Sequence, residues 1–439
     1  MLNLDGWQDL PSVMVLDKTM ISPGAKGWIN KYFDLVEKGQ IELVVNRPEG
    51  LRKLHFMHLT LSHSGIVFGF PNEMIFGKSV ETTDWTHEEK LKFLLFESHL
   101  FVFIQIHKDQ VFNKEEFLTT LFDFYELHSA SAIKKVFKFF VKESREEKIE
   151  SILSKRVDIK VKILENKWWV NSLSNAFTYL DVILFDDFVH KEKDTALKSY
   201  SNYAMNALTA ITLSSYSDGV LEDKEIAMFN IFLASANLGD EDRDQAKEKF
   251  KNGAELDDFS FFVNDHWLLK RFILDVAILT ILSSEDIDDD EMNFLQSLCE
   301  HLEIPIHELE ENLGLIENFL LDTKEEVVFM KDAPSYEKMY SSLSKRWVKI
   351  LMRNKDKLAV ELKQSKELVS LVKKSRKEEL TKEEKEMVKT QFKDIAKSIP
   401  TLTIFMLPGG AILLPILLKI MPDLIPSAFK ENEIEDQDV

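Results

Sequence analysis

An apolar segment near the C-terminal end of the sequence constrains the fold more than any other feature. It reads TLTIFMLPGGAILLPILLKIMPDLIPSAF, from Thr401 to Phe429, in a chain whose formal net charge is −20. Residues 402–418 carry no charge, and an extension back to Ile399 reaches about the 20 residues that a bilayer core requires. Prolines are costly in soluble helices, but transmembrane helices tolerate them because neighbouring groups re-satisfy the backbone. The segment 398–429 is therefore predicted to cross a membrane, and a buried or re-entrant hairpin broken at Pro408 is the alternative.

The charges on the two sides of this segment differ. Four lysines precede it, and Lys419 lies at its far boundary, before an acidic tail at 430–439. The four are Lys385, Lys389, Lys393 and Lys397. Because positively charged flanks stay in the cytoplasm, we predict a single-pass topology with a cytoplasmic N-terminal body.

The remainder of the chain has a composition typical of helical proteins. Only 14 of the 439 residues are glycine and 11 are proline, which favours helices over turn-rich β architectures. The predicted fold class is therefore mainly α, in more than one domain, because the chain exceeds one ordinary core. The predicted parts are a helical N-terminal region at 1–190, a two-fold repeated acidic helical domain at 195–325, a basic amphipathic helical segment at 326–397, the transmembrane segment at 398–429 and the acidic tail at 430–439.

The N-terminal region contains one long apolar run, from Leu91 to Ile106. Charged and polar side chains interrupt it, among them Glu97 and His99, so we predict a buried helix rather than a transmembrane one. Upstream of this run, partial alternation of apolar and polar residues around Gly65 and Gly69 predicts a short hairpin.

Several classes of site and function are excluded or disfavoured. His55, His58 and His63 have no carboxylate or cysteine at helical or hairpin spacing, so we predict packing or surface roles for them rather than a metal site. The net charge argues against a specific nucleic-acid partner, because phosphate contacts need clustered lysine and arginine. The sequence has no glycine-rich phosphate loop, no zinc-ligand spacing and no G-x-S-x-G motif. We therefore predict that the protein is not an enzyme.

Residues 200–325 contain an internal repeat. The copies ALTAITLSSYSDGVLEDKEIAMFNIFLASANL and DVAILTILSSEDIDDDEMNFLQSLCEHLEI align when Glu225 is placed over Glu291. In each copy an apolar helix ends in an acidic turn that contains serine, and a second apolar helix follows. The pattern predicts two helix–turn–helix units that pack as a pseudo-symmetric pair.

The two acidic turns are candidate cation ligands, because Ca²⁺ or another divalent cation takes several carboxylate and carbonyl oxygens. The candidate ligands are Asp218, Glu222 and Glu225 from the first turn and Asp286, Asp288 and Glu291 from the second. The alternative is that these carboxylates only cap helices, since Asp288 and Glu291 have capping-box spacing and acidic residues suit a helix N-terminus. Gly219 suits the chain reversal in the first turn. An EF-hand is excluded because the sixth position from Asp286 is not glycine.

The first turn resembles a known module. SSYSDGVLEDKE followed by an amphipathic helix is similar to the TerB-like (tellurite-resistance) domain, an all-helical two-fold repeat whose acidic turns are associated with divalent metal. The second copy has Ser284 and Glu285 where that family has Asp-Gly. The resemblance implies a cation-responsive middle domain.

The C-terminal segment resembles the LETM family, named for a leucine-zipper, EF-hand-containing transmembrane protein. Its signature has a basic helix with a Lys/Arg-x-Asp step, an apolar run opened by proline, then Leu-Pro, Lys-x-x-Pro and a closing Leu-x-Pro-Ser-x-Phe. The matching residues are Lys393, Asp394, Pro400, Pro408, Leu414, Pro415, Lys419, Pro422, Leu424, Pro426, Ser427 and Phe429. The family's acidic residue before Leu-Leu-Pro is replaced here by an apolar residue or glycine, in GGAILLP.

The resemblance implies a membrane-embedded segment in a protein linked to cation/proton exchange and to ribosome contact. The whole arrangement is similar to a bacterial group of LETM-related, biofilm-associated proteins, which implies the bacterial cytoplasmic (inner) membrane. We expect a membrane-anchored protein with a cytoplasmic cation-responsive domain that supports ion homeostasis or envelope and biofilm processes. The alternatives are an oligomeric cation/proton transporter and a ribosome- or membrane-surface-binding adaptor. The implied partners are the lipid bilayer, further copies of the chain in a homo-oligomer, and a ribosome or envelope protein.

Overall fold

A computed structural model gives the fold. It describes residues 21–47, 50–108, 110–128, 143–158, 175–190, 199–219, 221–260, 267–284, 287–323, 336–375, 378–399, 402 and 418. Over these residues the protein consists of helices joined by turns and loops, without a β-strand. The predicted fold class, mainly α, is confirmed.

The N-terminal region folds around one central helix, α3 (His87–Ile106), which is buried along most of its length. The elements around it are α1 (Trp28–Glu37), α2 (Lys53–Ser64), the 3-10 helix η1 (Ile66–Phe68), α4 (Lys114–His128), α6 (Arg145–Val157) and α8 (Thr178–His190). All of these contact α3, and α1 does so through the Tyr32 hydroxyl, which donates to Glu97 at 3.0 Å. Glu97 is fully buried in α3, where it accepts hydrogen bonds from the backbone N–H groups of Ile75 (2.8 Å) and Gly77 (2.7 Å). The prediction of a buried helix is confirmed, because its polar residues find partners inside the protein.

The hairpin predicted around Gly65 and Gly69 is wrong, because the chain there forms α2 and η1. Both glycines have positive φ, 83° and 64°, a conformation that glycine adopts without steric cost. A Cβ at Gly65 would collide with the carbonyl oxygen of Phe70, and a Cβ at Gly69 would lie 2.5 Å from that of Asn175. The apolar pattern is irregular because α2 is buried on more than one face, so it has no single apolar stripe.

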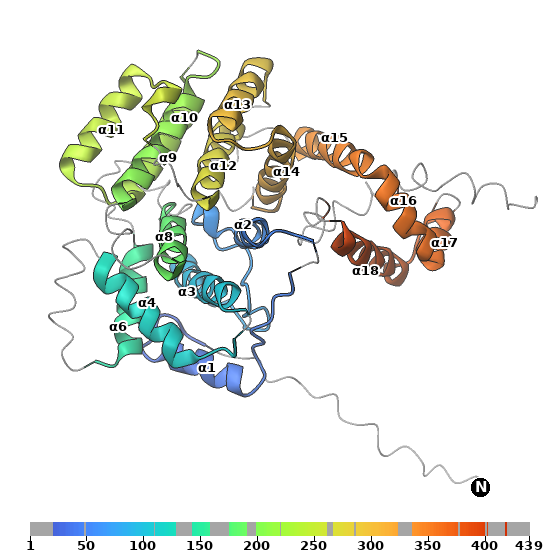
Figure 1. Cartoon of the computed structure of the whole chain (residues 1–439), viewed down its shortest axis with the longest axis horizontal. Helices are drawn as coiled ribbons and strands as arrows, with labels where there is room; N and C mark the ends of the chain where they lie inside the picture. Colours follow the sequence, from blue (N-terminus) through green and yellow to red (C-terminus); the bar gives the residue numbers. More distant parts are fainter. Residues whose placement is uncertain are drawn as a thin grey trace, which may run out of the picture.

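The predicted repeat is confirmed as two helix–turn–helix units. The first consists of α9 (Ser199–Ser215) and α10 (Asp223–Ser235), and the second of α12 (Trp267–Ser284) and α13 (Asp289–His301). Between them in sequence lie α11 (Asp240–Asn252) and the 3-10 helix η4 (Leu256–Asp258). α9 packs directly against α12, and α10 also contacts α12 (Figure 1). The two units therefore share one apolar interior.

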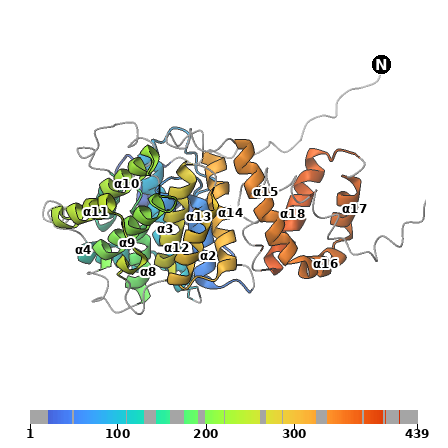
Figure 2. The ribbon, with the colours of Figure 1, turned by 90° about the horizontal axis from the view of Figure 1, so that it is seen from above.

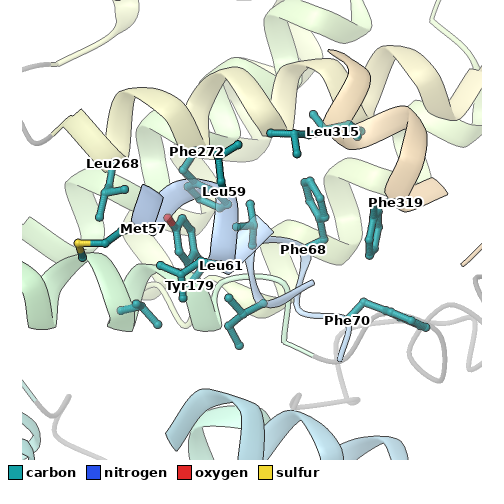
Figure 3. Close-up of a cluster of buried hydrophobic side chains, with 14 of the residues drawn as sticks. Met57, Leu59, Leu61, Phe68, Phe70, Tyr179, Leu268, Phe272, Leu315 and Phe319 are labelled. Atoms are coloured by element: carbon teal, nitrogen blue, oxygen red, sulfur yellow. The ribbon is translucent and has the colours of Figure 1, made fainter. Parts of the chain in front are cut away.

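The repeat is joined to the N-terminal region by a shared core. α12 contacts both α2 and α8, and Figure 3 shows the apolar side chains gathered at this junction. The ring centroids of Phe68 and Phe319 lie 4.7 Å apart, and those of Tyr179 and Phe272 lie 5.4 Å apart. Core contacts therefore cross the domain boundary predicted between residues 190 and 195, and the division of the chain into two domains there stays a prediction.

The basic segment forms helices to one side of this body, as both ribbon views show (Figures 1 and 2). These are α15 (Tyr336–Arg353), α16 (Lys355–Gln364), α17 (Lys366–Lys374) and α18 (Lys382–Ser398). α15 packs on α14 (Ile306–Thr323), the last helix of the body. The predicted amphipathic character is confirmed, because the recurring apolar residues are buried. They are Trp347, Ile350, Leu351, Leu358, Leu362, Leu368, Val369, Leu371 and Val372.

Among the described residues, no helix is long and apolar enough to span a membrane. The segment predicted to do so, 398–429, lies outside the described residues except for Ser398, Ile399, Leu402 and Leu418. The acidic tail also lies outside them. The transmembrane span and its topology stay predictions.

Candidate functional site

The first acidic turn reverses the chain after α9. The backbone N–H of Gly219 donates to the carbonyl oxygen of Tyr216 at 3.2 Å, and Gly219 has a φ of 80°. This confirms the predicted role of the glycine. α10 then begins after its N-cap, Glu222, whose N–H donates to the Glu225 carboxylate at 2.9 Å. Glu225 is thereby turned back onto the turn, where it is buried.

The second acidic turn is built in the same way. Asp288 is the N-cap of α13, and its carboxylate accepts a hydrogen bond from the N–H of Glu291 at 2.8 Å. In return, the N–H of Asp288 donates to the Glu291 carboxylate at 2.8 Å. The predicted capping box is therefore present, and Glu225 and Glu291 occupy equivalent positions of the repeat.

The two turns lie close enough for their charges to act on one another. Burial raises the pKa of Glu225 to about 7, with contributions from the negative charges of Asp218, Glu222 and Glu291. Burial also raises the pKa of Glu291 to about 7. The negative charges that add to this second shift are those of Asp288 and, from the other copy, Asp218 and Glu222. The fold thus brings five of the six predicted ligands into one electrostatic neighbourhood, and the sixth, Asp286, lies outside the described residues.

This arrangement can hold a proton or take up a cation. Two carboxyls that titrate near neutral pH carry a variable charge, and carboxylate oxygens are the ligands that Ca²⁺ prefers. In the described part of the chain, however, no three acidic, histidine or cysteine side chains already stand in metal-binding geometry. The donor chemistry fits a divalent cation while the observed geometry is that of helix caps, so the cation site stays a prediction.

The three histidines each face a carboxylate that is distant in sequence or beyond the next turn. The Nε2–carboxylate distances are 3.4 Å for His55 and Glu311, 2.7 Å for His58 and Asp275, and 2.6 Å for His63 and Glu73. Burial lowers the pKa of His58, which is almost inaccessible to solvent. This burial agrees with the packing role predicted for His58.

His58 belongs to a buried polar network centred on Arg271, which we call the Arg271 network. Asp275 accepts hydrogen bonds from His58 and, at 2.6 Å, from the side-chain amide of Asn312. Arg271 donates to the amide oxygen of Asn312 at 2.6 Å and pairs with Glu308. Sequence reasoning missed this network. The available signal was the pair Arg271 and Asp275, one turn apart in the mostly apolar α12, because buried charges require partners.

The predicted membrane motif is described only at its start. Lys393 and Asp394 lie in α18, and Asp394 is exposed. The other motif residues lie outside the described residues: Pro400, Pro408, Leu414, Pro415, Lys419, Pro422, Leu424, Pro426, Ser427 and Phe429.

Comparison with known families agrees with the C-terminal resemblance. Residues 380–439 match the family model described as "LETM1-like, RBD". The match begins just before α18 and includes every residue of the predicted membrane motif. No curated protein and no solved structure matches the chain. The C-terminal part of the protein is thus similar to the LETM1-like family, and the TerB-like resemblance of residues 195–325 stays a prediction.

Proposed function

We propose that the protein is a membrane-anchored, LETM-related protein whose helical body responds to cations and thereby supports ion homeostasis or envelope and biofilm processes. The observation that carries this proposal is the LETM1-like match of residues 380–439, which coincides with the apolar, proline-rich segment. In this proposal the body lies on the cytoplasmic side of the bacterial inner membrane, because lysines precede that segment. The proposal assigns the protein no catalytic step.

The cation-responsive part of the proposal rests on the paired acidic turns. The strongest side-chain charges acting on Glu225 and Glu291 are all negative, so a bound divalent cation would relieve repulsion that the fold leaves in place. Such a cation would also favour the ionised form of both carboxyls, because an adjacent positive charge lowers a carboxyl pKa. It would tie the N-terminus of α10 to that of α13, and so connect the two halves of the repeat.

Membrane fractionation tests the anchor. Full-length protein expressed in a bacterium is expected to resist carbonate extraction, and deletion of residues 399–439 is expected to release a folded soluble body. Recovery of the full-length protein in the soluble fraction without detergent would refute the anchor.

Thiol labelling tests the orientation. The natural Cys299 is unsuitable, because it is buried and burial raises the pKa of its thiol to about 12. We expect Ser427→Cys to react with an impermeant thiol reagent in intact spheroplasts. The exposed Lys355→Cys is expected to react only after lysis, and the reverse pattern would contradict the topology.

An adaptor for the ribosome or the membrane surface is the second candidate, because the matched description includes RBD and basic helices lead into that segment. Co-sedimentation of the detergent-solubilised full-length protein with ribosomes would favour it, because residues 380–439 are then present. An oligomeric cation/proton transporter is the third candidate, and it requires several copies because one span cannot form a pathway. Ion flux in proteoliposomes would favour the transporter over the anchored sensor.

A further inference from the structure

A basic pocket lies where the helical body meets the basic segment, between α13, α14 and α15. Its volume is about 620 Å³, which is the size of a small-molecule site. One wall is a single face of α15, since its lining residues recur three or four positions apart. These are Lys338, Ser341, Ser342, Lys345, Arg346 and Lys349. The opposite wall includes Gln296 from α13 and Glu310 from α14.

The lining carries more positive than negative charge. Four of its side chains are cationic, and Glu310 is its one carboxylate. Burial alone would raise the pKa of Glu310, but a hydrogen bond from Lys349 and the charge of Arg346 hold it below its ordinary value. Glu310 is therefore ionised and, together with Glu317 behind Arg346, offsets two of the four cations. The pocket keeps a net positive charge within a chain of strongly negative total charge.

Part of this lining is held in place before any ligand arrives. The Nε of Arg346 donates to Glu317 at 2.9 Å, and its Nη1 lies 3.3 Å from Glu310. The Ser342 hydroxyl also donates to Glu317, at 2.9 Å. Lys345 is exposed and forms no ion pair with any described residue. A rigid arginine beside a cation with no internal partner suits the capture of an anion.

We propose that this pocket binds a phosphate group carried by a small organic molecule or by a lipid headgroup. Lysine and arginine donors at the wall would neutralise the phosphate charge, and the hydroxyl of Ser341 would add a hydrogen bond. A phosphate group suits these lining residues because its several oxygens can accept hydrogen bonds from donors on α15 and on the neighbouring helix α13. The pocket lies entirely within described helices, so the inference does not depend on the membrane anchor or on the acidic turns.

The test uses the full-length protein in a neutral detergent, with calorimetric titrations at constant ionic strength. The soluble probe is glycerol 3-phosphate. The lipid probes are dihexanoyl phosphatidic acid and, as its match without a phosphomonoester, dihexanoyl phosphatidylcholine. Binding of glycerol 3-phosphate identifies a free phosphate compound as a ligand class. Binding of phosphatidic acid, without binding of glycerol 3-phosphate or phosphatidylcholine, identifies a lipid headgroup as the ligand class.

Three variants distinguish a built pocket from general electrostatic attraction. Lys338→Gln with Lys345→Gln is expected to weaken binding by at least about tenfold, because it removes two positive charges that would face the phosphate. Ser341→Ala leaves the charge unchanged and is expected to weaken binding several-fold. The matched control is Lys355→Gln with Lys357→Gln, which removes two exposed charges from α16 outside the pocket and is expected to change affinity by less than about twofold.

Circular dichroism and thermal melting of each variant would show that it is folded. Equal losses in the pocket pair and the control pair would overturn the proposal, because they would indicate only the overall basic charge of the segment. Absence of binding by every phosphate probe would overturn it as well.

Discussion

The Arg271 network and the paired acidic turns both gather carboxylates in the interior or at its edge, but only the network supplies partners for them. Asp275 and Glu308 face Arg271, His58 and an asparagine, and the guanidinium of Arg271 also lies 4.7 Å from the Trp267 ring. Burial lowers the pKa of Arg271 to about 10, so it stays charged at neutral pH. Arg52 also pairs with Glu308, at 2.9 Å, so two cations face the two carboxylates and the network is electrically compensated without a ligand.

The acidic turns show the opposite arrangement. Glu225 and Glu291 are buried and accept backbone hydrogen bonds, yet the side-chain charges that contribute most to their raised pKa are other carboxylates. The backbone therefore orients the two carboxyls while their charge stays uncompensated. A satisfied hydrogen bond therefore does not neutralise a buried charge, and the turns, rather than the network, are suited to bind a proton or a cation.

The largest effect is expected from breaking the Arg271 network. Arg271→Met should lower the free energy of unfolding by about 3–5 kcal/mol, because it leaves buried carboxylates without their cation. Chemical denaturation at neutral pH measures this loss. Arg145→Met is the control, since Arg145 pairs with a mostly exposed Glu115 and should change stability by less than about 1 kcal/mol. Similar losses in both variants would show that the network is not structurally special.

Stability is expected to fall as the pH rises through the pKa of the two central glutamates. Their folded pKa of about 7 lies above the ordinary value of 4.5. The folded state therefore binds more protons between these values, and stability declines from about pH 5 to about pH 8. Glu225→Gln with Glu291→Gln keeps hydrogen-bonding side chains at the caps but removes both charges. It should be more stable than the unmodified protein at about pH 8, by at least about 1.4 kcal/mol, which is the value of a single pKa unit.

Other buried groups also titrate in this range, so the difference between the two proteins is the informative quantity. Burial lowers the pKa of His87 and His99 to about 4. These two histidines have the opposite effect, because the free energy of unfolding that they contribute is lost as the pH falls. Both proteins share this contribution, and subtraction of their denaturation curves removes it. If Glu225→Gln with Glu291→Gln were less stable than the unmodified protein at about pH 8, this would contradict the inference that the charge of the two glutamates is uncompensated.

A divalent cation is expected to stabilise the protein by binding at the turns. Ca²⁺ at tenfold its Kd should add about 1.4 kcal/mol, if it binds only the folded state, and should raise the Tm. Asp218→Asn with Glu225→Gln should remove most of this rise. The control variant is Glu241→Gln with Glu248→Gln, which neutralises two exposed carboxylates on α11 and should keep the rise.

Ionic strength is controlled with KCl, because screening acts alike for both salts. Equal shifts in KCl and CaCl₂, or no heat in a calcium titration, would leave helix capping as the role of the turns. The full chain is used because α12 packs against α2 and α8, so a fragment limited to the repeat would lose part of its core.

The smallest effect on the free energy of unfolding is expected from substitution of an exposed acidic residue beside the second acidic turn. Asp290 lies in the first turn of α13 and is exposed. Asp290→Asn should cost only about 0.3–1 kcal/mol, through the helix dipole, and should leave the pH dependence unchanged. A shift in the pH profile as large as that of the glutamate pair would show that total charge, rather than buried charge, controls the turns.

Local sequence determined much of this protein. Low glycine and proline content predicted the helical class, the repeat alignment paired Glu225 with Glu291, and the spacing of Asp288 and Glu291 predicted a capping box that the structure contains. The basic face and the buried apolar face of α15 could also be read from a period of three to four residues. These features depend on neighbours within one or two helical turns, which the sequence displays directly.

Only the tertiary structure decided which distant residues meet. The 53–70 segment is helical although its pattern suggested a hairpin, because packing from several sides removed the single apolar stripe on which periodicity depends. His58 and Asp275 are 217 positions apart in sequence, and Glu310 faces Lys349 only because α15 folds back onto α14. Charge compensation depends on distances in space, which a one-dimensional pattern does not contain. For that reason the sequence named the acidic residues of the turns, whereas the fold decided that carboxylates from both turns would act on Glu225 and Glu291.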